Sequence, residues 1–331
     1  MGMDFDTLQL QKVAEPIIRS APFSRLYKVT FLGILSPRFR DLRGFPISYG
    51  RNVSGESDET RGHHSACVAS LMGKLASKLM LPKRAIDYAV AWGLLHDIAT
   101  WPLSHTGEAS FSNSTETDSR DLRSMMIFGS HRIPNSLSLY HIIKSMSLDH
   151  EIMVELFNKK ATGFGPDLEA VHKIIHSTLT PDALEGMHRS GRVFDVYVPC
   201  PHEFLKTIER DLISGIRVRE DGSDLVFKFW RGKAKIYSDY INTYKSIEFE
   251  SMWSRAIQEA FAKLSLKETL ELSEAEIVRR IAGAAVVRGK DVQRYKDPLC
   301  YVIADDYKRR RKFDKSVPIE ALSNIFIKNK I

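Results

Sequence analysis

The chain of 331 residues carries a formal net charge of +7, and its composition is 43% hydrophobic and 10% aromatic. A chain of this length and apolar content buries a substantial core without help from disulfides or metals, which excludes an intrinsically disordered protein. The positive charge favours anionic partners, meaning nucleotides, nucleic acid or acidic surfaces.

The cysteines and the N-terminal segment indicate the cellular compartment. Cys67, Cys200 and Cys300 lie far apart and form no CxxC pair, which argues against a disulfide framework and against a cysteine zinc site. Residues 1–16 carry acids where a signal peptide would carry bases, and no apolar run approaches the roughly 20 residues that span a bilayer. We therefore expect a soluble cytoplasmic protein with no membrane partner.

The first part of the chain has the pattern of a helix bundle. Apolar residues recur at helical spacing through most of residues 1–190, for example in segments 68–79 and 86–94. Two stretches rich in Ser, Thr, Asp and Glu, 50–62 and 110–121, are predicted to be loops.

A small β element is predicted next. The segment GRVFDVYV (191–198) has the pattern of a strand, and residues 216–230 have the pattern of a hairpin that turns at Asp221 and Gly222.

Helical spacing returns over residues 233–267 and 273–283, and a basic run, KRRRK, follows at 308–312. The predicted fold class is therefore all-α, with a small β-hairpin. We expect a core at 1–190 and a C-terminal extension at 191–331, made of the hairpin and helices, that packs on this core.

Four segments carry histidines and carboxylates of the kind that bind divalent metal ions: RGHHS (61–65), LLHDIA (94–99), LSHTGE (103–108) and TPDALEG (180–186). Imidazole together with carboxylate suits zinc, iron or manganese rather than calcium. These segments therefore predict a transition-metal site.

The position of each candidate ligand in its helix supports this prediction. His64 opens a predicted helix in phase with its apolar residues, so its side chain should lie on the buried face. His96 and Asp97 end an apolar helix, where burying an ionisable pair is costly unless a metal or hydrogen-bonding partners compensate. Asp182 follows a Thr-Pro pair that is typical of a helix start. Each residue alone also fits a structural role, as a core histidine or as a carboxylate that complements the helix dipole.

The order of these residues, with a His-Asp pair about 30 residues after the first histidine, matches the H…HD…D order of the HD superfamily of metal-dependent phosphohydrolases. The chain resembles in particular the sterile-alpha-motif and HD-domain triphosphohydrolases and bacterial dGTPases, in which an RxxHS segment opens the metal helix and LxHDxGHxPFSH closes the next. Segments 22–33 and 180–189 also resemble parts of these proteins, and a looser similarity covers 235–261, 273–281 and 306–313. The residues in register with the two motifs are Arg61, His64, Ser65, His96, Asp97, Pro102, Ser104 and His105.

The resemblance implies an all-α HD-domain helix bundle, often a homo-oligomer, and one divalent transition metal held by His64, His96, Asp97 and Asp182. Manganese, iron or zinc is expected, and magnesium is a further candidate. The implied partners are a nucleotide substrate and a nucleotide activator, and the basic run at 308–312 adds nucleic acid as a candidate partner.

Three further residues receive catalytic roles. His105 matches a family histidine near the scissile phosphate, which implies a general acid, and Glu108 could orient it through a hydrogen bond. Arg61 precedes the first metal ligand and could clamp two phosphate oxygens at once, although a solvated arginine would show the same pattern.

The chain also departs from the family pattern. The second histidine of HDxGH is replaced by Thr100, which lies between Ala99 and Trp101. A later family helix offers a His-Glu pair, but the corresponding stretch here has no histidine before His131. A family tyrosine that packs on the nucleotide sugar is replaced by Gly186.

These observations leave three hypotheses. The first is a dNTP triphosphohydrolase, which converts a dNTP to deoxynucleoside and triphosphate. The second is a phosphomonoesterase or phosphodiesterase that acts on another nucleotide or on nucleic acid. The third is a non-catalytic HD protein that binds a nucleotide for regulation.

Overall fold

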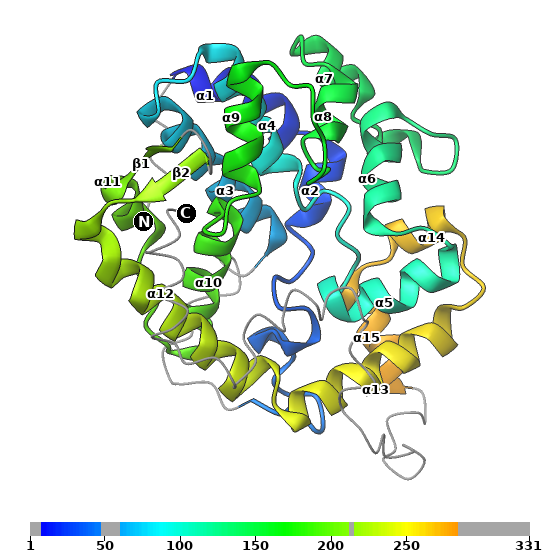
Figure 1. Cartoon of the computed structure of the whole chain (residues 1–331). Helices are drawn as coiled ribbons and strands as arrows, with labels where there is room; N and C mark the ends of the chain where they lie inside the picture. Colours follow the sequence, from blue (N-terminus) through cyan, green and yellow to red (C-terminus); the bar gives the residue numbers. More distant parts are fainter. Residues whose placement is uncertain (1–7, 48–59, 212–214, 284–331) are drawn as a thin grey trace.

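The structure is a computed structural model, and it describes residues 8–47, 60–211 and 215–283 (Figure 1). These residues form fifteen α-helices and one two-stranded antiparallel sheet. The prediction of an all-α fold with a small β-hairpin is therefore confirmed. Among the described residues, no helix combines the length and the apolar character needed to cross a membrane.

The helices and strands divide the described residues as follows. In chain order they are α1 (Leu8–Ile18), α2 (Ala21–Leu26), α3 (Arg61–Lys78), α4 (Lys83–Leu95), α5 (Ser104–Thr115), α6 (Ser119–Phe128), α7 (Tyr140–Ser145), α8 (His150–Glu155), α9 (Pro166–Ile175), α10 (Pro181–Phe194), α11 (Pro201–Thr207), β1 (Ile208–Asp211), β2 (Gly215–Val218), α12 (Ser223–Ile236), a π-helical turn (Tyr237–Ile241), α13 (Tyr244–Phe261), α14 (Leu266–Glu271) and α15 (Glu274–Gly283).

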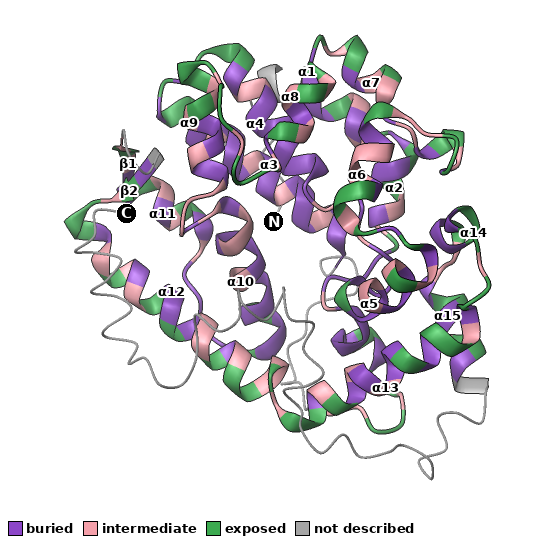
Figure 2. Cartoon of the chain, turned by 45° about the vertical axis from the view of Figure 1, so that its right-hand side comes forward, coloured by how far each residue is buried: buried purple, intermediate pink, exposed green. Residues whose placement is uncertain are grey.

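Helices α3 and α4 form the centre of the core and are largely buried (Figure 2). Their backbones approach closely at Gly93, where a Cβ atom would lie 2.5 Å from Cα of Ala69. Glycine is therefore required at this crossing, because any side chain would push the helices apart. This contact holds the start of α3 and the end of α4 in a fixed relation, and these are the two ends that carry predicted metal ligands.

Helix α10 packs against α3 and begins where the sequence predicts a helix start. The Thr180 hydroxyl caps the helix by accepting a hydrogen bond from the amide of Ala183 at 2.9 Å, and Pro181 occupies the first helical position. Asp182 therefore lies in the first turn, as predicted.

The C-terminal helices pack on the helices that carry the site. Helix α12 lies against α10, and α13 lies along α5, where the Ser110 hydroxyl donates to the carbonyl of Ser254 at 2.6 Å. The boundary expected at residue 190 lies inside α10.

The strand predicted at 191–198 is wrong. Residues 191–194 are the last turn of α10, which ends at Asp195 in the left-handed conformation (φ 53°). The amide of Val196 then donates to the carbonyl of Gly191 at 2.8 Å, closing the helix end. The alternating apolar residues after this point fill the core without pairing to another strand in the described part of the chain.

The hairpin predicted at 216–230 is displaced. Its first segment does form a strand, β2, but it pairs with the preceding strand β1, with Ile208 opposite Val218. The turn residues Asp221 and Gly222 instead lead into α12. The apolar residues Val226, Phe229 and Trp230 of α12 are buried together because their spacing is helical.

The loop predicted at 110–121 is also wrong over most of its length. Residues 110–115 belong to α5 and 119–121 to α6. The hydroxyls of Ser114 and Thr115 donate to the carbonyl of Phe111, so the helix satisfies these polar side chains internally. Of the other predicted loop, 50–62, residues 60–62 are described, and the prediction is wrong for Arg61 and Gly62, which begin α3. The basic run at 308–312 lies outside the described residues.

Candidate metal centre

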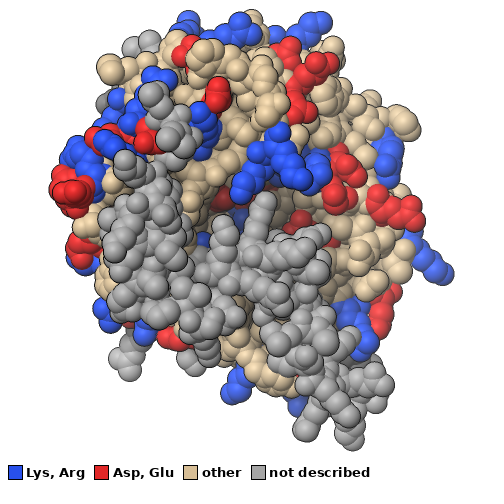
Figure 3. Space-filling model, viewed as in Figure 1, with Lys and Arg blue, Asp and Glu red and all other residues tan. Residues whose placement is uncertain are grey.

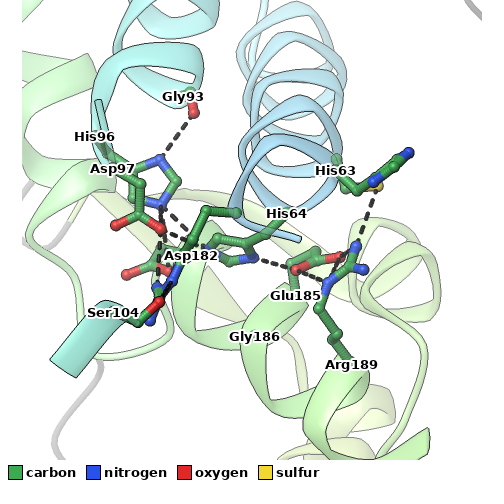
Figure 4. A network of polar contacts seen from close by, with 12 residues as sticks. His63, His64, Gly93, His96, Asp97, Ser104, Asp182, Glu185, Gly186 and Arg189 are labelled. Atoms are coloured by element: carbon green, nitrogen blue, oxygen red, sulfur yellow. Dashed lines mark hydrogen bonds and ion pairs between the residues drawn. The ribbon is translucent and has the colours of Figure 1, made fainter. Parts of the chain in front are cut away.

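The predicted ligands meet where three helix ends converge (Figure 4). His64 comes from the first turn of α3, His96 and Asp97 follow the end of α4, and Asp182 comes from the first turn of α10. Nε2 of His64 lies 3.1 Å from Nε2 of His96. An oxygen of Asp97 lies 3.9 Å and 3.7 Å from these two nitrogens. His64, His96 and Asp97 thus form a group that could hold a metal ion.

Asp182 borders this group. Its Oδ1 lies 3.0 Å from Nε2 of His64 and 3.6 Å from Nε2 of His96. The carboxylate is half-exposed, whereas both imidazoles are buried, so Asp182 lies on the solvent side of the group.

The outer ring nitrogens of both histidines are held by acceptors. Nδ1 of His96 donates to the carbonyl of Gly93 at 2.8 Å. Nδ1 of His64 is in hydrogen-bond contact with the carboxylate of Glu185. Burial raises the pKa of Glu185, but His64 and Arg189 outweigh burial and lower it to about 2, so this carboxylate is an acceptor. In the neutral imidazoles both Nε2 atoms therefore carry a lone pair, which is the tautomer that metal-binding histidines use.

A cation can neutralise the lone pairs and carboxylate charges that meet at this centre. Burial lowers the pKa of His64, but the charges and hydrogen bonds of Glu185 and Asp182 outweigh it and raise that pKa to about 9. Burial raises the pKa of Asp97, yet Arg61 and the two histidines hold it well below its ordinary value. A proton on Nε2 of His64 or a divalent ion can neutralise these converging lone pairs. Two imidazoles with carboxylate oxygens fit zinc, iron or manganese.

A second layer of side chains supports His64 from α10. Arg189 holds Glu185 in a buried ion pair, with Nη2 and Oε1 2.5 Å apart. Arg189 also donates to Sγ of Cys67 at 3.7 Å. Glu185 and Arg189 were not predicted as site residues. They follow Asp182 by three and seven residues, so the helical period that places Asp182 could have found them.

His96 is supported by a column of stacked side chains. The Trp92 ring stacks on the His96 ring with centroids 5.4 Å apart, and Phe157 stacks on Trp92 at 5.9 Å. The Arg123 guanidinium covers Phe157 at 4.3 Å and donates to the carbonyl of His96 at 2.8 Å. Arg123 comes from the stretch that lacks the family's His-Glu pair, and the sequence carried no signal for this role.

Arg61 is not a solvated arginine, because its side chain is only 8% exposed. Its Nη1 pairs with Oδ2 of Asp97 at 2.9 Å, its Nε donates to the Ser104 hydroxyl at 3.1 Å, and its Nη2 contacts Nε2 of His105 at 3.2 Å. Arg61 therefore links the candidate metal ligand Asp97 to the predicted catalytic histidine.

His105 and Glu108 lie together as predicted. Nδ1 of His105 is 3.4 Å from Oε2 of Glu108, whose other oxygen accepts from the Ser119 hydroxyl. Burial raises the pKa of Glu108, but the hydrogen bond and charge of His105, with smaller contributions from Ser119 and Arg61, together outweigh it and lower that pKa. Since a guanidinium only donates, Nε2 of His105 accepts from Arg61, and Nδ1 carries the proton. In this arrangement His105 is set as a proton acceptor, and the predicted general-acid role needs a proton at Nε2.

Two of the departures from the family pattern, Thr100 and Gly186, have different structural consequences. Thr100 closes the turn after the His-Asp pair, where its amide donates to the carbonyl of Asp97 at 2.8 Å. A Cβ atom on Gly186 would lie 3.3 Å from Cζ of Phe31 and 3.6 Å from Cε1 of His64. The Phe31 ring packs on His64 at 4.8 Å, so it occupies the space into which a side chain at 186 would point. Phe31 was not predicted as a site residue.

No protein-family model matches the chain, and no curated protein matches it in sequence. The resemblance to the HD phosphohydrolases rests on the motifs quoted above.

Proposed function

We propose that this chain is a metal-dependent HD phosphohydrolase that acts on nucleotides. The observation that supports this proposal is the convergence of His64, His96, Asp97 and Asp182, with both Nδ1 atoms already held by acceptors. With both Nδ1 atoms held as donors, both Nε2 atoms can offer a lone pair to a divalent ion, as metal-binding histidines do.

The charges around the centre favour an anionic substrate. When His64 is protonated, its positive charge and three guanidiniums balance four carboxylates. The residues counted are Arg61, Arg123 and Arg189, with Asp97, Glu108, Asp182 and Glu185. Exchange of the proton for a divalent ion leaves the set with one positive charge. A group of Lys and Arg side chains also lies near the middle of the face seen in Figure 3.

When bound, a divalent ion supplies Lewis acidity that polarises a phosphate oxygen and lowers the pKa of water. In the proposed mechanism His64, His96, Asp97 and Asp182 hold the ion. The contact between Arg61 and His105 is the point at which a phosphate oxygen would enter, because Arg61 can donate to it and His105 can do so once Nε2 is protonated.

His105 transfers the proton in this mechanism. Once a phosphate oxygen replaces the contact with Arg61, Nε2 of His105 can take up a proton from water and give it to the leaving oxygen. The carboxylate of Glu108 at Nδ1 stabilises the imidazolium that then forms.

For the substrate we propose a dNTP, cleaved to deoxynucleoside and triphosphate, on the basis of the family resemblance. The packing of Phe31 against Gly186 and His64 favours a second candidate, a phosphomonoester or phosphodiester of another nucleotide or of nucleic acid. Thr100 and the missing His-Glu pair favour the third, nucleotide binding without turnover. The homo-oligomer and the nucleotide activator are also proposals from the resemblance.

To test this, the purified protein is incubated with each dNTP, with the NTPs and with labelled nucleic-acid strands, singly and in mixtures. Each incubation contains Mn²⁺, Mg²⁺, Fe²⁺ or Zn²⁺. Chromatography identifies the products. Release of triphosphate supports the first candidate, and release of monophosphate or cleaved strands supports the second. Activity should vanish in His96→Ala and Asp97→Ala but persist in His131→Ala, which replaces an exposed histidine outside the centre. Turnover that survives both ligand variants would refute the proposal.

A further inference from the structure

A buried carboxylate on α15, that of Glu274, contacts the backbone next to Ser104 and His105. The side chain of Glu274 is 3% exposed. A single oxygen, Oε1, accepts hydrogen bonds from the Thr30 amide at 3.0 Å, the Thr30 hydroxyl at 3.1 Å and the Leu103 amide at 2.7 Å. These donors precede Glu274 by 244 and 171 residues in sequence. Glu274 thus joins three distant parts of the chain.

The two residues that Glu274 holds lie on either side of the Ser104 hydroxyl. This hydroxyl donates to the carbonyl of Thr30 and accepts from Nε of Arg61 at 3.1 Å. Leu103 directly precedes Ser104. Ser104 therefore connects the residues that Glu274 holds to the Arg61 guanidinium, which its ion pair with Asp97 holds independently.

The turn that Glu274 holds is strained. Leu103 and Ser104 both adopt the left-handed conformation, with φ of 61° and 50°. Such conformations cost on the order of 1–3 kcal/mol each in residues other than glycine, and persist only where surrounding contacts enforce them. Gly33 packs against this turn so closely that a Cβ atom would lie 2.4 Å from the carbonyl oxygen of Leu103. The bond from the Leu103 amide to Glu274 is one of the contacts that enforce the turn.

We propose that Glu274 is a positioning residue for the proposed hydrolase. It holds the Leu103–Ser104 turn so that His105, the next residue, meets Arg61. The candidate metal ligands come from α3, α4 and α10 and not from this turn. Loss of Glu274 should therefore misplace His105 and leave metal binding intact. This inference rests on the proposed function only for its kinetic consequence.

The chemistry of the contact defines a conservative variant. All three donors converge on Oε1, and Oε2 has no hydrogen-bond partner among the described residues. Burial raises the pKa of Glu274, and the donors from Thr30 and Leu103 lower it only in part. The contact therefore needs one well-placed acceptor more than it needs a charge. A glutamine supplies the same acceptor, whereas an alanine supplies none.

The kinetic test compares Glu274→Ala with Glu274→Gln. A control, Glu276→Ala, loosens the start of the same helix, because the Glu276 carboxylate accepts hydrogen bonds there from the amide and hydroxyl of Ser273. We expect kcat to fall by about 100-fold in Glu274→Ala, the scale of a misplacement near 1 Å. KM and Mn²⁺ affinity should stay unchanged, and Glu274→Gln and the control should resemble the wild type. Adding Glu274→Ala to His105→Ala should cause no further loss of kcat, since both act through His105.

A second readout needs no substrate. Hydrogen exchange of the Leu103 and Thr30 amides should accelerate in Glu274→Ala, and the NMR signal of His105 should shift, with neither change in Glu276→Ala. If no substrate is ever turned over, the proposed function fails, while this readout still decides the positioning role. Should Glu274→Ala not fold, Glu274→Asp provides the test, because its shorter side chain cannot reach both donors. An unchanged His105 signal in the folded variant, or a glutamine variant as impaired as the alanine variant, would overturn the inference.

Discussion

Proton and metal compete for the same lone pair in this centre. Without an ion, the pKa of His64 is raised to about 9, because Glu185 and Asp182 together outweigh the effect of burial. At neutral pH Nε2 of His64 therefore carries a proton that is donated to Asp182, 3.0 Å away. A divalent ion needs that lone pair, so metal binding must release this proton.

The size of this proton competition follows from the raised pKa of His64. Below about pH 9 the apparent metal affinity should rise tenfold per pH unit, and at pH 7 proton competition should weaken it by about 100-fold. About one proton should leave for each ion bound at pH 7, and almost none at pH 10. The metal affinity rises with pH because the pKa of His64 is raised. If this pKa were lowered, Nε2 of His64 would carry no proton at neutral pH and none would be released.

Titration calorimetry with Mn²⁺ or Zn²⁺, in buffers of different ionisation enthalpy, measures the protons released. In Glu185→Gln the largest charge that raises the pKa of His64 is lost, so fewer protons should leave at pH 7. The exposed histidine variant His131→Ala should match the wild type. Metal binding without proton release at pH 7 would refute the reasoning.

Three further predictions concern stability and the support of the centre. The metal-free protein should lose about 3 kcal/mol of unfolding free energy between pH 6.5 and pH 9, because a raised His64 pKa stabilises the fold only while the imidazole is protonated. Urea unfolding in the presence of a chelator measures this free energy. The variant His64→Gln should not show the decrease between the two pH values. Trp92→Ala removes the stacking partner of His96 and should weaken metal affinity by about 10- to 100-fold. Trp92→Phe should largely preserve this affinity. The calorimetric titration described above measures both. Gly186→Tyr should cost about 1–3 kcal/mol through overpacking against Phe31, and thermal unfolding should show partial recovery when Phe31→Ala is added.

Local signals in the sequence predicted much of the centre. The apolar phase of α3 places His64 on the buried face, and the Thr-Pro pair places Asp182 in the first turn of α10. Both inferences need only the helical period and the chemistry of helix starts. The same period relates Glu185 and Arg189 to Asp182, so these two supports were within reach of the sequence.

Other elements depended on contacts that no local pattern encodes. Val196 and Val198 alternate with exposed residues as in a strand, yet they fill the core beyond the end of α10 without a partner strand in the described residues. A strand needs a neighbouring strand to satisfy its backbone, and only the tertiary structure decides whether one lies alongside.

The sequence by itself determined that the chain is helical, that it has a buried core and that it carries a histidine and aspartate set of the kind that binds metal. The tertiary structure alone decided that Arg61 pairs with Asp97, that Arg123 backs His96 and that Glu274 holds the turn before His105. The physical reason is that helical period and capping act within a few residues, so the sequence displays them directly. A contact between residues 171 apart depends on how whole helices pack, and no local pattern specifies that packing.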